Sequence, residues 1–365
     1  MDVIEVSAPG KLVLFGEYAV LFGAPAAVVA VDRRAIVTLR PFAGNGWEVA
    51  APGLVAQRAR LEVEPDNTVR WHDAKLGRDA FSLVDMLLRG IGDSGSIDLV
   101  NLPPLAATLD TRAFFESAGG WESKLGLGSS AALTVAFVSA LEVCAGGEPT
   151  TRLQEFVDLH RGVQGGAGSG IDVAASLLGG VIRYRLADDG SVAQASPLVL
   201  PEDLRTVFVW TGRAASTGDF LGQLRARREE EPQEVNPVLD ELGTISSEGI
   251  GALTDGDATG FLDAVDAFWE VLDQLGKLIG MPILSEEHRS LRRHAIDCGV
   301  RYKPSGAGGG DFGIGFSAGS DAAAEFMNRA QTSGFHVLDL GIDRSGLVRS
   351  RAVPCRGNAH LRRPL

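Results

Sequence analysis

The chain has 365 residues, 45% of them hydrophobic, and is long enough for about two domains with a sizeable buried core. Its formal net charge of −13 argues against a nucleic-acid partner, because binding to the phosphate backbone needs concentrated lysine and arginine. The longest apolar run, residues 24–31, is far shorter than the ~18 residues of a membrane span, and the N-terminus lacks a signal-peptide pattern. The three cysteines show no metal spacing, and we expect a cytoplasmic protein without membrane contact.

The first half of the chain is predicted to be rich in β-structure. Residues 3–8 and 26–39 have the valine and isoleucine enrichment of strands, and residues 46–72 continue with short hairpin pieces. Apolar periodicity then predicts helices over residues 81–91, 130–144, 151–163 and 171–178, followed by a strand over 180–186.

The composition changes near Pro197 and Pro201, and residues 205–211 predict a strand that opens a second half. Helical patterns dominate beyond it, over residues 217–228, 235–248, 258–279, 286–298 and 321–333. Short strands near 301, over 312–317 and over 336–340 would form a small sheet. The sequence therefore predicts an α+β protein with domains over residues 1–200 and 201–365 and a cleft between them.

The segment Lys124–Leu133 predicts an anion cradle at the start of a helix. Gly126 and Gly128 let the backbone approach a ligand, and the first N–H groups of a helix after Ser129 have no intrahelical partner. Together with the helix dipole, these donors favour a phosphate group. Ser129 or Ser130 can cap the helix or turn a hydroxyl toward a phosphate-bound Mg²⁺. An ordinary serine-capped helix after a glycine turn is the alternative.

Lys11 directly follows a proline-glycine pair. A strand that reaches Pro9 and Gly10 would leave Lys11 fixed on a turn. A positioned ammonium group can stabilise the charge on a transferring phosphoryl group. A surface lysine after a turn is the alternative interpretation.

Two further loops are dense in glycine. Residues 165–175 deliver Asp172 to the first turn of an apolar helix, where the acid can complement the helix dipole or accept a proton from a substrate hydroxyl. Residues 303–315 contain four glycines between 306 and 310, more than a simple hairpin turn needs. We expect this second loop to pass close to a bound ligand; a flexible loop is the alternative.

In chain order, the segment with Lys11, the segment Lys124–Leu133 and the two glycine-dense loops resemble the motifs of the GHMP kinase superfamily, named for galactokinase, homoserine kinase, mevalonate kinase and phosphomevalonate kinase. The resemblance spans positions 7–315. It implies an N-terminal domain with a left-handed βαβ unit, a ferredoxin-like C-terminal domain, and ATP with its acceptor between them. It matches Lys11 and Asp172 to the family's catalytic lysine and aspartate, and it implies Mg²⁺ near Ser130. ATP phosphates are then expected on Lys124, Gly126, Gly128, Ser129, Ser130 and Ala131.

Details of the motifs resemble the phosphomevalonate kinase branch. Residues 16–20 are similar to that branch, whereas mevalonate kinases usually carry histidine at the position of Tyr18; residues 168–175, 210–217 and 303–311 are similar too. The resemblance implies ATP-dependent phosphoryl transfer to 5-phosphomevalonate by a monomer or homodimer. Contacts to this small-molecule acceptor are expected from Tyr18, Ser169, Arg213, Ser216, Lys303, Ser305, Gly306, Gly308 and Gly309.

Other members of the superfamily stay open as alternatives. A mevalonate kinase would use the same machinery, although that branch has a Mg²⁺-binding glutamate where this chain has residues 160–162, His-Arg-Gly. Residues 21–23 and Phe312 also depart from the phosphomevalonate kinase pattern. A mevalonate-phosphate decarboxylase usually lacks the Pro-Gly-Lys arrangement, and a nucleotide sensor would bind ATP without turnover. The basic C-terminal residues, Arg349, Arg351, Arg356, Arg362 and Arg363, are predicted to be a solvated tail without function.

Overall fold

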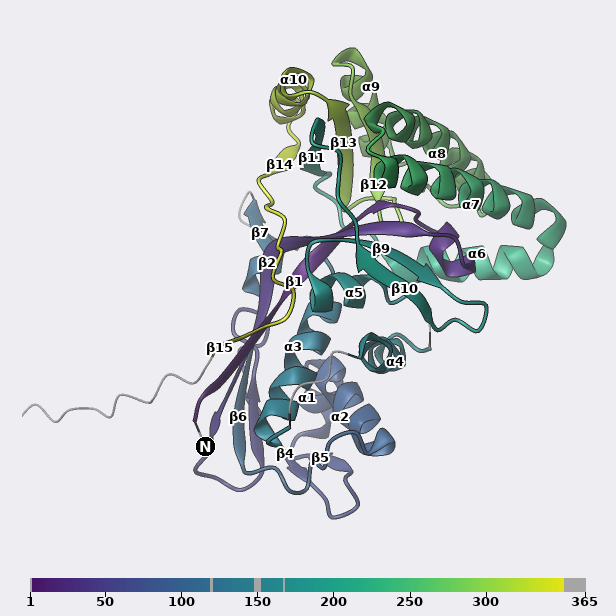
Figure 1. The fold of residues 1–365 in the computed structure, drawn as a ribbon. Coiled ribbons are helices and arrows are strands. Elements are labelled where there is room, and N and C mark those ends of the chain that lie inside the picture. Colours follow the sequence, from purple (N-terminus) through teal and green to yellow (C-terminus); the bar gives the residue numbers. More distant parts are fainter. Residues whose placement is uncertain (1, 119–120, 148–151, 167, 351–365) are drawn as a thin grey trace, which may run out of the picture.

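The computed structural model describes residues 2–118, 121–147, 152–166 and 168–350, and shows an α+β fold with two main sheets (Figure 1). The larger sheet has nine strands in the order β10-β9-β2-β6-β3-β4-β5, with β1 paired to β2 and β15 paired to β1. Its strands are β1 (Ile4–Phe15), β2 (Ala26–Pro41), β3 (Trp47–Ala50), β4 (Ala59–Val63), β5 (Val69–Trp71), β6 (Leu105–Asp110), β9 (Val181–Leu186), β10 (Val192–Pro197) and β15 (Val348–Ser350).

The smaller sheet has four strands in the order β12-β13-β11-β14. They are β11 (Leu204–Trp210), β12 (Arg301–Ser305), β13 (Phe312–Ala318) and β14 (His336–Leu338). A separate hairpin joins β7 (Phe115–Ala118) and β8 (Trp121–Lys124) just before the predicted anion cradle.

Helices cover both sheets. In the first half of the chain they are α1 (Ala74–Asp79), α2 (Ser82–Ser94), α3 (Ser129–Cys144), α4 (Leu153–Val163) and α5 (Ile171–Leu178), with short 3-10 helices η1 (Ala19–Phe22) and η2 (Arg112–Phe114). In the second half they are α6 (Thr217–Glu230), α7 (Pro232–Asp255), α8 (Ala258–Leu278), α9 (Glu286–Asp297) and α10 (Ser320–Thr332). Among the described residues, no helix is both long and apolar enough to span a membrane.

The predicted helices are confirmed to within a few residues, except that α7 extends further at both ends than its periodicity indicated. Helix α3 is buried on nearly every face because it packs against β1, β2 and α5. Its alanines and serines let the neighbouring backbones approach closely, which fits the apolar composition that predicted a buried helix. This packing places the start of α3 beside the middle of β1.

The prediction of a turn at Lys11 was wrong. Strand β1 continues through Pro9 and Gly10 to Phe15, and its pairing with β2 shifts register between those two residues. A β-bulge therefore absorbs the proline-glycine pair, and Lys11 lies on the strand just beyond it. The strand fixes Lys11 more firmly than a turn would.

The end of the described chain returns to the larger sheet. Strand β15 pairs with β1, and Ile342 forms an isolated bridge with Val31. Arg34 ties this segment down by donating to the carbonyl oxygens of Ser7 and Gly346, both at 2.7 Å, and by an ion pair with Asp343. Of the predicted basic tail, Arg349 is exposed on β15, and Arg351, Arg356, Arg362 and Arg363 lie outside the described residues.

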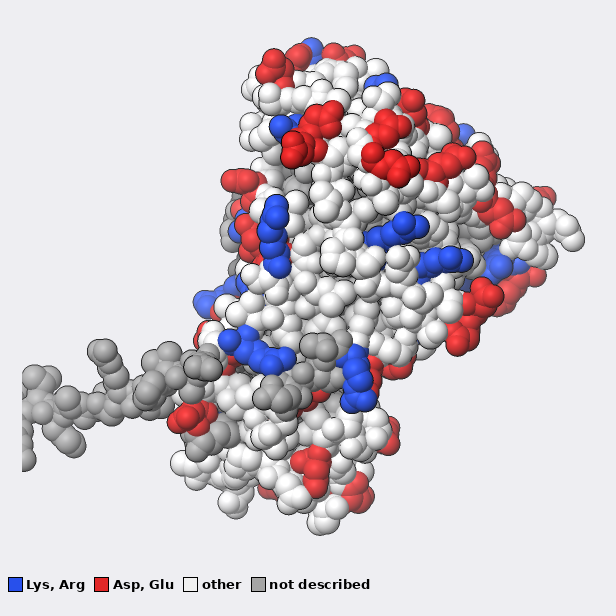
Figure 2. All heavy atoms as spheres, in the orientation of Figure 1, with Lys and Arg blue, Asp and Glu red and all other residues white. Residues whose placement is uncertain are grey.

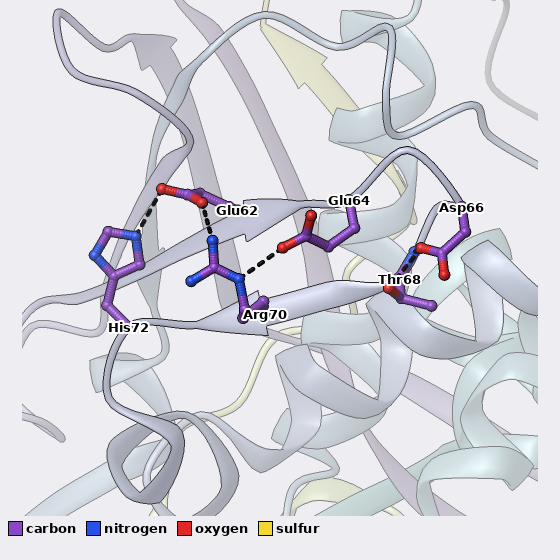
Figure 3. Close-up of polar contacts among 6 residues, drawn as sticks. All are labelled: Glu62, Glu64, Asp66, Thr68, Arg70 and His72. Carbon is purple, nitrogen blue, oxygen red and sulfur yellow. Dashed lines mark hydrogen bonds and ion pairs between the residues drawn. The ribbon is translucent and has the colours of Figure 1, made fainter.

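The β4–β5 hairpin carries an exposed polar network (Figure 3). Arg70 is held between Glu62 and Glu64, His72 contacts Glu62 at 3.0 Å, and the Thr68 hydroxyl donates to Asp66. Solvent screens these contacts, so they fix the shape of the hairpin more than they stabilise the protein. The hairpin lies at the end of the larger sheet that is remote from the smaller sheet (Figure 1).

A hollow of about 380 Å³ lies between α6 and the larger-sheet half of the molecule. Acidic side chains are spread over the outer helices of the second half, whereas lysines and arginines gather near the middle of the face shown in Figure 2. The hollow has a basic lining in an acidic protein, because Arg161, Arg225 and Arg228 contribute to it.

Candidate active site

Lys11 is placed across the predicted anion cradle. Its backbone N–H donates to the carbonyl oxygen of Leu127 at 2.8 Å, so β1 is bonded to the loop that precedes α3. A β-carbon built at Gly128 would lie 3.1 Å from both Cγ and Cε of Lys11. The Lys11 side chain therefore lies along the backbone of Gly128, which has no side chain, and extends toward the start of α3.

The start of α3 presents free backbone donors. Gly128 is the N-cap residue in the left-handed conformation, with φ of 76°, and no side chain of the described residues caps the helix. The alternative of a serine-capped helix was therefore wrong, since neither Ser129 nor Ser130 caps it. Uncapped N–H groups and the helix dipole favour an anion at this position.

Ser130 and Asp172 lie on opposite sides of one buried imidazole ring. The hydroxyl oxygen of Ser130 is 3.2 Å from Nε2 of His160, and Oδ2 of Asp172 is 3.9 Å from Nδ1. The three residues come from α3, α5 and α4, which lie side by side (Figure 1). The ring thereby links a predicted nucleotide residue to a predicted catalytic residue.

Asp172 occupies the first turn of α5, as the glycine-dense loop predicted. Gly170 is the N-cap with φ of 76° and supplies no capping side chain, while the Ser169 hydroxyl oxygen accepts from the N–H of Ile171 at 3.4 Å. One carboxylate oxygen accepts from the N–H of Val173 at 3.0 Å, and 21% of the Asp172 side chain is exposed. The carboxylate can therefore meet a ligand.

Asp311 joins the third glycine loop to the cradle. Its carboxyl group lies so close to Gly126 that a β-carbon there would overlap it. Burial raises the pKa of the Asp311 carboxyl, while the N–H of Ala215 and the nearby ammonium groups of Lys11 and Lys124 lower it. The segment with Lys11, the segment with Gly126 and the loop with Asp311 thus meet in this part of the structure.

The third loop needs its glycines largely for contacts within the protein. β-carbons at Gly308 and Gly309 would collide with the carbonyl of Ile283 and the ring of Phe220. A β-carbon at Gly306, in contrast, would meet no heavy atom within 4 Å. Neighbouring residues therefore occupy the side-chain space at Gly308 and Gly309, whereas Gly306 faces open space, and the predicted contacts of these glycines with a ligand stay predictions.

His288 anchors the same loop. Its Nε2 is 3.0 Å from the carbonyl oxygen of Gly310, and its Nδ1 is 2.9 Å from the hydroxyl of Tyr302. A carbonyl oxygen only accepts, so Nε2 carries the proton and the Tyr302 hydroxyl donates to Nδ1. Burial lowers the pKa of His288 to about 4, which keeps the ring neutral at physiological pH.

Lys303 lies in a buried ion pair between the two halves of the chain. Its ammonium group contacts Glu17 and donates to the carbonyl oxygen of Pro304 at 2.7 Å, and the lysine is fully buried. The Ser305 hydroxyl donates to the carbonyl oxygen of Val13 at 3.0 Å, and the Tyr18 hydroxyl donates to that of Ala307. These residues hold β12 against β1, and their predicted contacts with an acceptor stay predictions.

The remaining predicted acceptor residues lie at loop ends. Ser216 caps α6 by accepting from the N–H of Asp219, and Arg213 is exposed, with its carbonyl accepting from the N–H of Asp311. The carbonyl of Ser169 accepts from the hydroxyl of Tyr184 at 2.6 Å. Ser169 therefore lies on the loop that leads to Asp172, and Arg213 lies on the segment that holds Asp311.

The donor set fits a magnesium ion that is held mainly by phosphate. No group of three or more histidine, cysteine, aspartate or glutamate side chains in the described part of the chain could form a metal cage. Mg²⁺ commonly takes one or two protein oxygens together with substrate phosphates. The Ser130 hydroxyl at the uncapped start of α3 and the partly exposed Asp172 carboxylate are suitable donors.

Sequence reasoning did not assign roles to Glu17, His160, His288 or Asp311. Each has its partner far away in the chain, as with the 30 residues between Ser130 and His160. A polar residue in an otherwise apolar helical pattern is the one signal that could have singled out His160, since it is 1% exposed on α4.

The chain is similar to known proteins in sequence and in fold. Residues 108–180 match the family model of the GHMP kinases N terminal domain. The chain is 30% identical over 345 residues to phosphomevalonate kinase of Streptomyces sp. (strain CL190), covering 84% of this chain and 88% of that protein. It is 29% identical over 254 residues to mevalonate kinase of Thermococcus onnurineus (strain NA1), covering 66% of this chain and 67% of that protein. The fold is similar to Streptococcus pneumoniae phosphomevalonate kinase in complex with phosphomevalonate and AMPPNP, with a TM-score of 0.71 and 20% identity over 94% of this chain and 100% of that one.

Proposed function

The chain belongs to the GHMP kinase family, and we propose that it transfers the γ-phosphoryl group of ATP to 5-phosphomevalonate, giving 5-diphosphomevalonate and ADP. The observation that carries this choice of acceptor is the combination of identity and coverage: the phosphomevalonate kinase relative is 30% identical over 84% of this chain, whereas the archaeal mevalonate kinase is 29% identical over 66% and the mevalonate kinase of Bos taurus 27% identical over 86%. The site would act on small molecules in the cytoplasm, as a monomer or a homodimer.

In this proposal the nucleotide phosphates bind at the start of α3. The uncapped N–H groups after Gly128 would hold phosphate oxygens, and Lys124 is exposed at the rim of the cradle. Mg²⁺, held by the Ser130 hydroxyl and phosphate oxygens, would supply charge neutralisation. Lys11 reaches the same place across Gly128 and would stabilise the charge on the transferring phosphoryl group.

The acceptor chemistry assigns a modest role to Asp172. A phosphate monoester is largely ionised near neutral pH, so one of its oxygens can attack the γ-phosphorus without general-base help. The P–O bond to ADP breaks as the new P–O bond forms. Positioning and charge neutralisation would then supply most of the rate, with Asp172 orienting Lys11 or the acceptor.

Mevalonate kinase is the second candidate, favoured by the similarity to the archaeal enzyme. Its acceptor is a hydroxyl group, which must lose a proton as it attacks. The Asp172 carboxylate, partly exposed at the start of α5, is placed to accept that proton. The two candidates thus differ in what they require of one residue.

A substrate panel tests the proposal. Purified protein with Mg²⁺-ATP is offered mevalonate, 5-phosphomevalonate or 5-diphosphomevalonate separately, and ADP and CO₂ are followed, with the Lys11→Met variant as the control for contaminating kinases. ADP release with 5-phosphomevalonate alone supports the proposal. ADP release with mevalonate alone selects mevalonate kinase, CO₂ release selects a decarboxylase, and no turnover with any acceptor overturns the kinase assignment.

A further inference from the structure

His160 is a buried polar residue in the middle of the candidate active site, and the function proposed above gives it no role. It is 1% exposed, and its ring is flanked by the Ser130 hydroxyl at 3.2 Å and the Asp172 carboxylate at 3.9 Å. Buried polar side chains are nearly always hydrogen-bonded, so the partners of the ring define its state. Both partners are residues with predicted roles in phosphoryl transfer.

The two contacts indicate which ring nitrogen carries the proton. A carboxylate can only accept, so the nitrogen that faces Asp172, Nδ1, is the protonated one in a neutral ring. At 3.9 Å this contact is an electrostatic attraction and not a hydrogen bond. Nε2 then offers a lone pair, and the Ser130 hydroxyl at 3.2 Å donates to it.

This arrangement fixes the direction of the Ser130 hydroxyl. A free serine hydroxyl can rotate and can present either its proton or its lone pairs to a ligand. Once the proton points to His160, the remaining lone pairs of the oxygen are available toward the uncapped start of α3, where an anion and its cation would bind. The same ring attracts the Asp172 carboxylate and restrains it at the start of α5.

We propose that His160 is a positioning residue: through opposite nitrogens of one imidazole ring, with the proton on Nδ1, it turns the lone pairs of the Ser130 hydroxyl toward the start of α3 and restrains Asp172. The proposal rests on the proposed function only for the roles of Ser130 and Asp172. Substituting a residue that orients a metal ligand typically lowers metal affinity or activity by about 10- to 100-fold.

The first test determines the tautomer of His160 by NMR, and His288 in the same protein serves as the reference. It is also fully buried, but its Nε2 donates to the Gly310 carbonyl, so its proton is on the other nitrogen. The proposal therefore predicts opposite tautomers for the two rings: protonated Nδ1 in His160 and protonated Nε2 in His288. Long-range ¹H–¹⁵N spectra of protein labelled with ¹⁵N-histidine distinguish these tautomers, and the His160→Gln and His288→Gln variants assign the signals.

The nucleotide-free protein is used, so this readout does not depend on catalysis. A protonated Nδ1 in His160, with a change in the Nε2 signal in the Ser130→Ala variant, supports the proposal. A protonated Nε2 in His160, or no response to Ser130→Ala, overturns it. Failure of the proposed function would appear separately, as absence of turnover in the substrate panel with the unaltered protein.

Kinetic variants form the second test. His160→Leu should lower kcat by about 10- to 100-fold and raise the half-saturating Mg²⁺ concentration, with little change in the KM of the acceptor. His160→Gln, whose amide can still accept from Ser130, should recover part of the loss. In the Ser130→Ala background, His160→Leu should have a much smaller further effect, because coupled residues are not additive.

Phe156→Leu is the matched control, since Phe156 is buried on α4 at 1% exposure and makes no polar contact with the site. It should lower the melting temperature while leaving kcat and the Mg²⁺ dependence unchanged. A merely structural His160 would behave like this control. Equal losses in His160→Leu and His160→Gln, or fully additive effects with Ser130→Ala, would contradict the proposal.

Discussion

The carboxyl group of Asp311 packs directly against the α-carbon of Gly126, so that the loop after β12 touches the loop before α3. Asp311 has a positive φ of 53°, a conformation that is uncommon for a residue other than glycine. Hydrogen bonds hold it there: its N–H donates to Arg213 and its carbonyl accepts from Thr211 at 2.9 Å. A residue held in this way can only reach Gly126 because no β-carbon is present.

Adding one methyl group at this contact tests its importance. Gly126→Ala would place a β-carbon on the Asp311 carboxyl group and push the two loops apart. Since a displacement of 1 Å can lower a rate by about 10²-fold, we expect kcat/KM for ATP to fall by about that factor. Gly222→Ala on α6, where the new methyl group meets no heavy atom within 4 Å, is the control and should leave activity unchanged. Full activity in Gly126→Ala would show that the contact does not position the site.

Lys11→Met separates charge from packing. The methionine side chain can still lie along Gly128, but the ammonium group is lost. If that group stabilises charge in the transition state, kcat should fall by about 10²-fold or more while the Kd for ATP changes little. Single-turnover rates and calorimetric titration with ATP measure the two quantities, and Lys75→Met on exposed α1 is the control. An unchanged kcat would refute the role of Lys11.

The effect of Asp172→Asn on kcat distinguishes a phosphate acceptor from a hydroxyl acceptor. Asp172→Asn keeps the shape and the contact with the Val173 N–H but removes the negative charge. With an acceptor that is already an ionised phosphate, no base is needed, and the loss in kcat should be smaller than in Lys11→Met. Near-complete loss of activity, measured with the acceptor that the substrate panel identifies, would argue for proton removal from a hydroxyl group.

Local patterns in the sequence were sufficient to predict most helices and the placement of Asp172, because those depend on periodicity and on the glycines next to them. Lys11 was misplaced because Pro9-Gly10 indicates a turn, whereas a β-bulge accommodates the pair within a strand. Strand β6 was missed, since its residues Leu105–Asp110 alternate only between buried and half-buried and include two alanines and a threonine. Contacts such as Gly126 with Asp311 depend on the packing of distant segments, which local patterns do not report.

The buried Glu17–Lys303 pair should dominate the stability of the contact between β1 and β12. Both side chains are almost fully buried, and burial opposes the charged form of each: it raises the pKa of Glu17 and lowers that of Lys303. Removing one partner leaves a buried charge without compensation, so Lys303→Met should lower the free energy of unfolding by about 3–5 kcal/mol. The double variant Glu17→Gln, Lys303→Met should recover much of this loss in urea unfolding. A double variant as unstable as the sum of the single variants would contradict a direct pairing.

His288 should make the protein less stable as the pH falls below neutrality. Burial lowers its pKa from 6.5 to about 4 in the folded protein, so between these values the unfolded chain binds a proton that the folded chain does not. The contribution of the neutral His288 ring to the free energy of unfolding is therefore fully present above pH 6.5 and is lost as the pH falls toward 4. The loss amounts to about 2 kcal/mol by pH 5. Urea unfolding at several pH values between 5 and 7.5 measures the slope. His288→Gln removes this titration and should flatten the slope by that amount, whereas Leu291→Ala, a buried change on the same helix, should lower stability equally at every pH. An unaltered slope in His288→Gln would mean that the imidazole is able to take up its proton in the folded protein, and that the neutral ring is not what holds the carbonyl of Gly310.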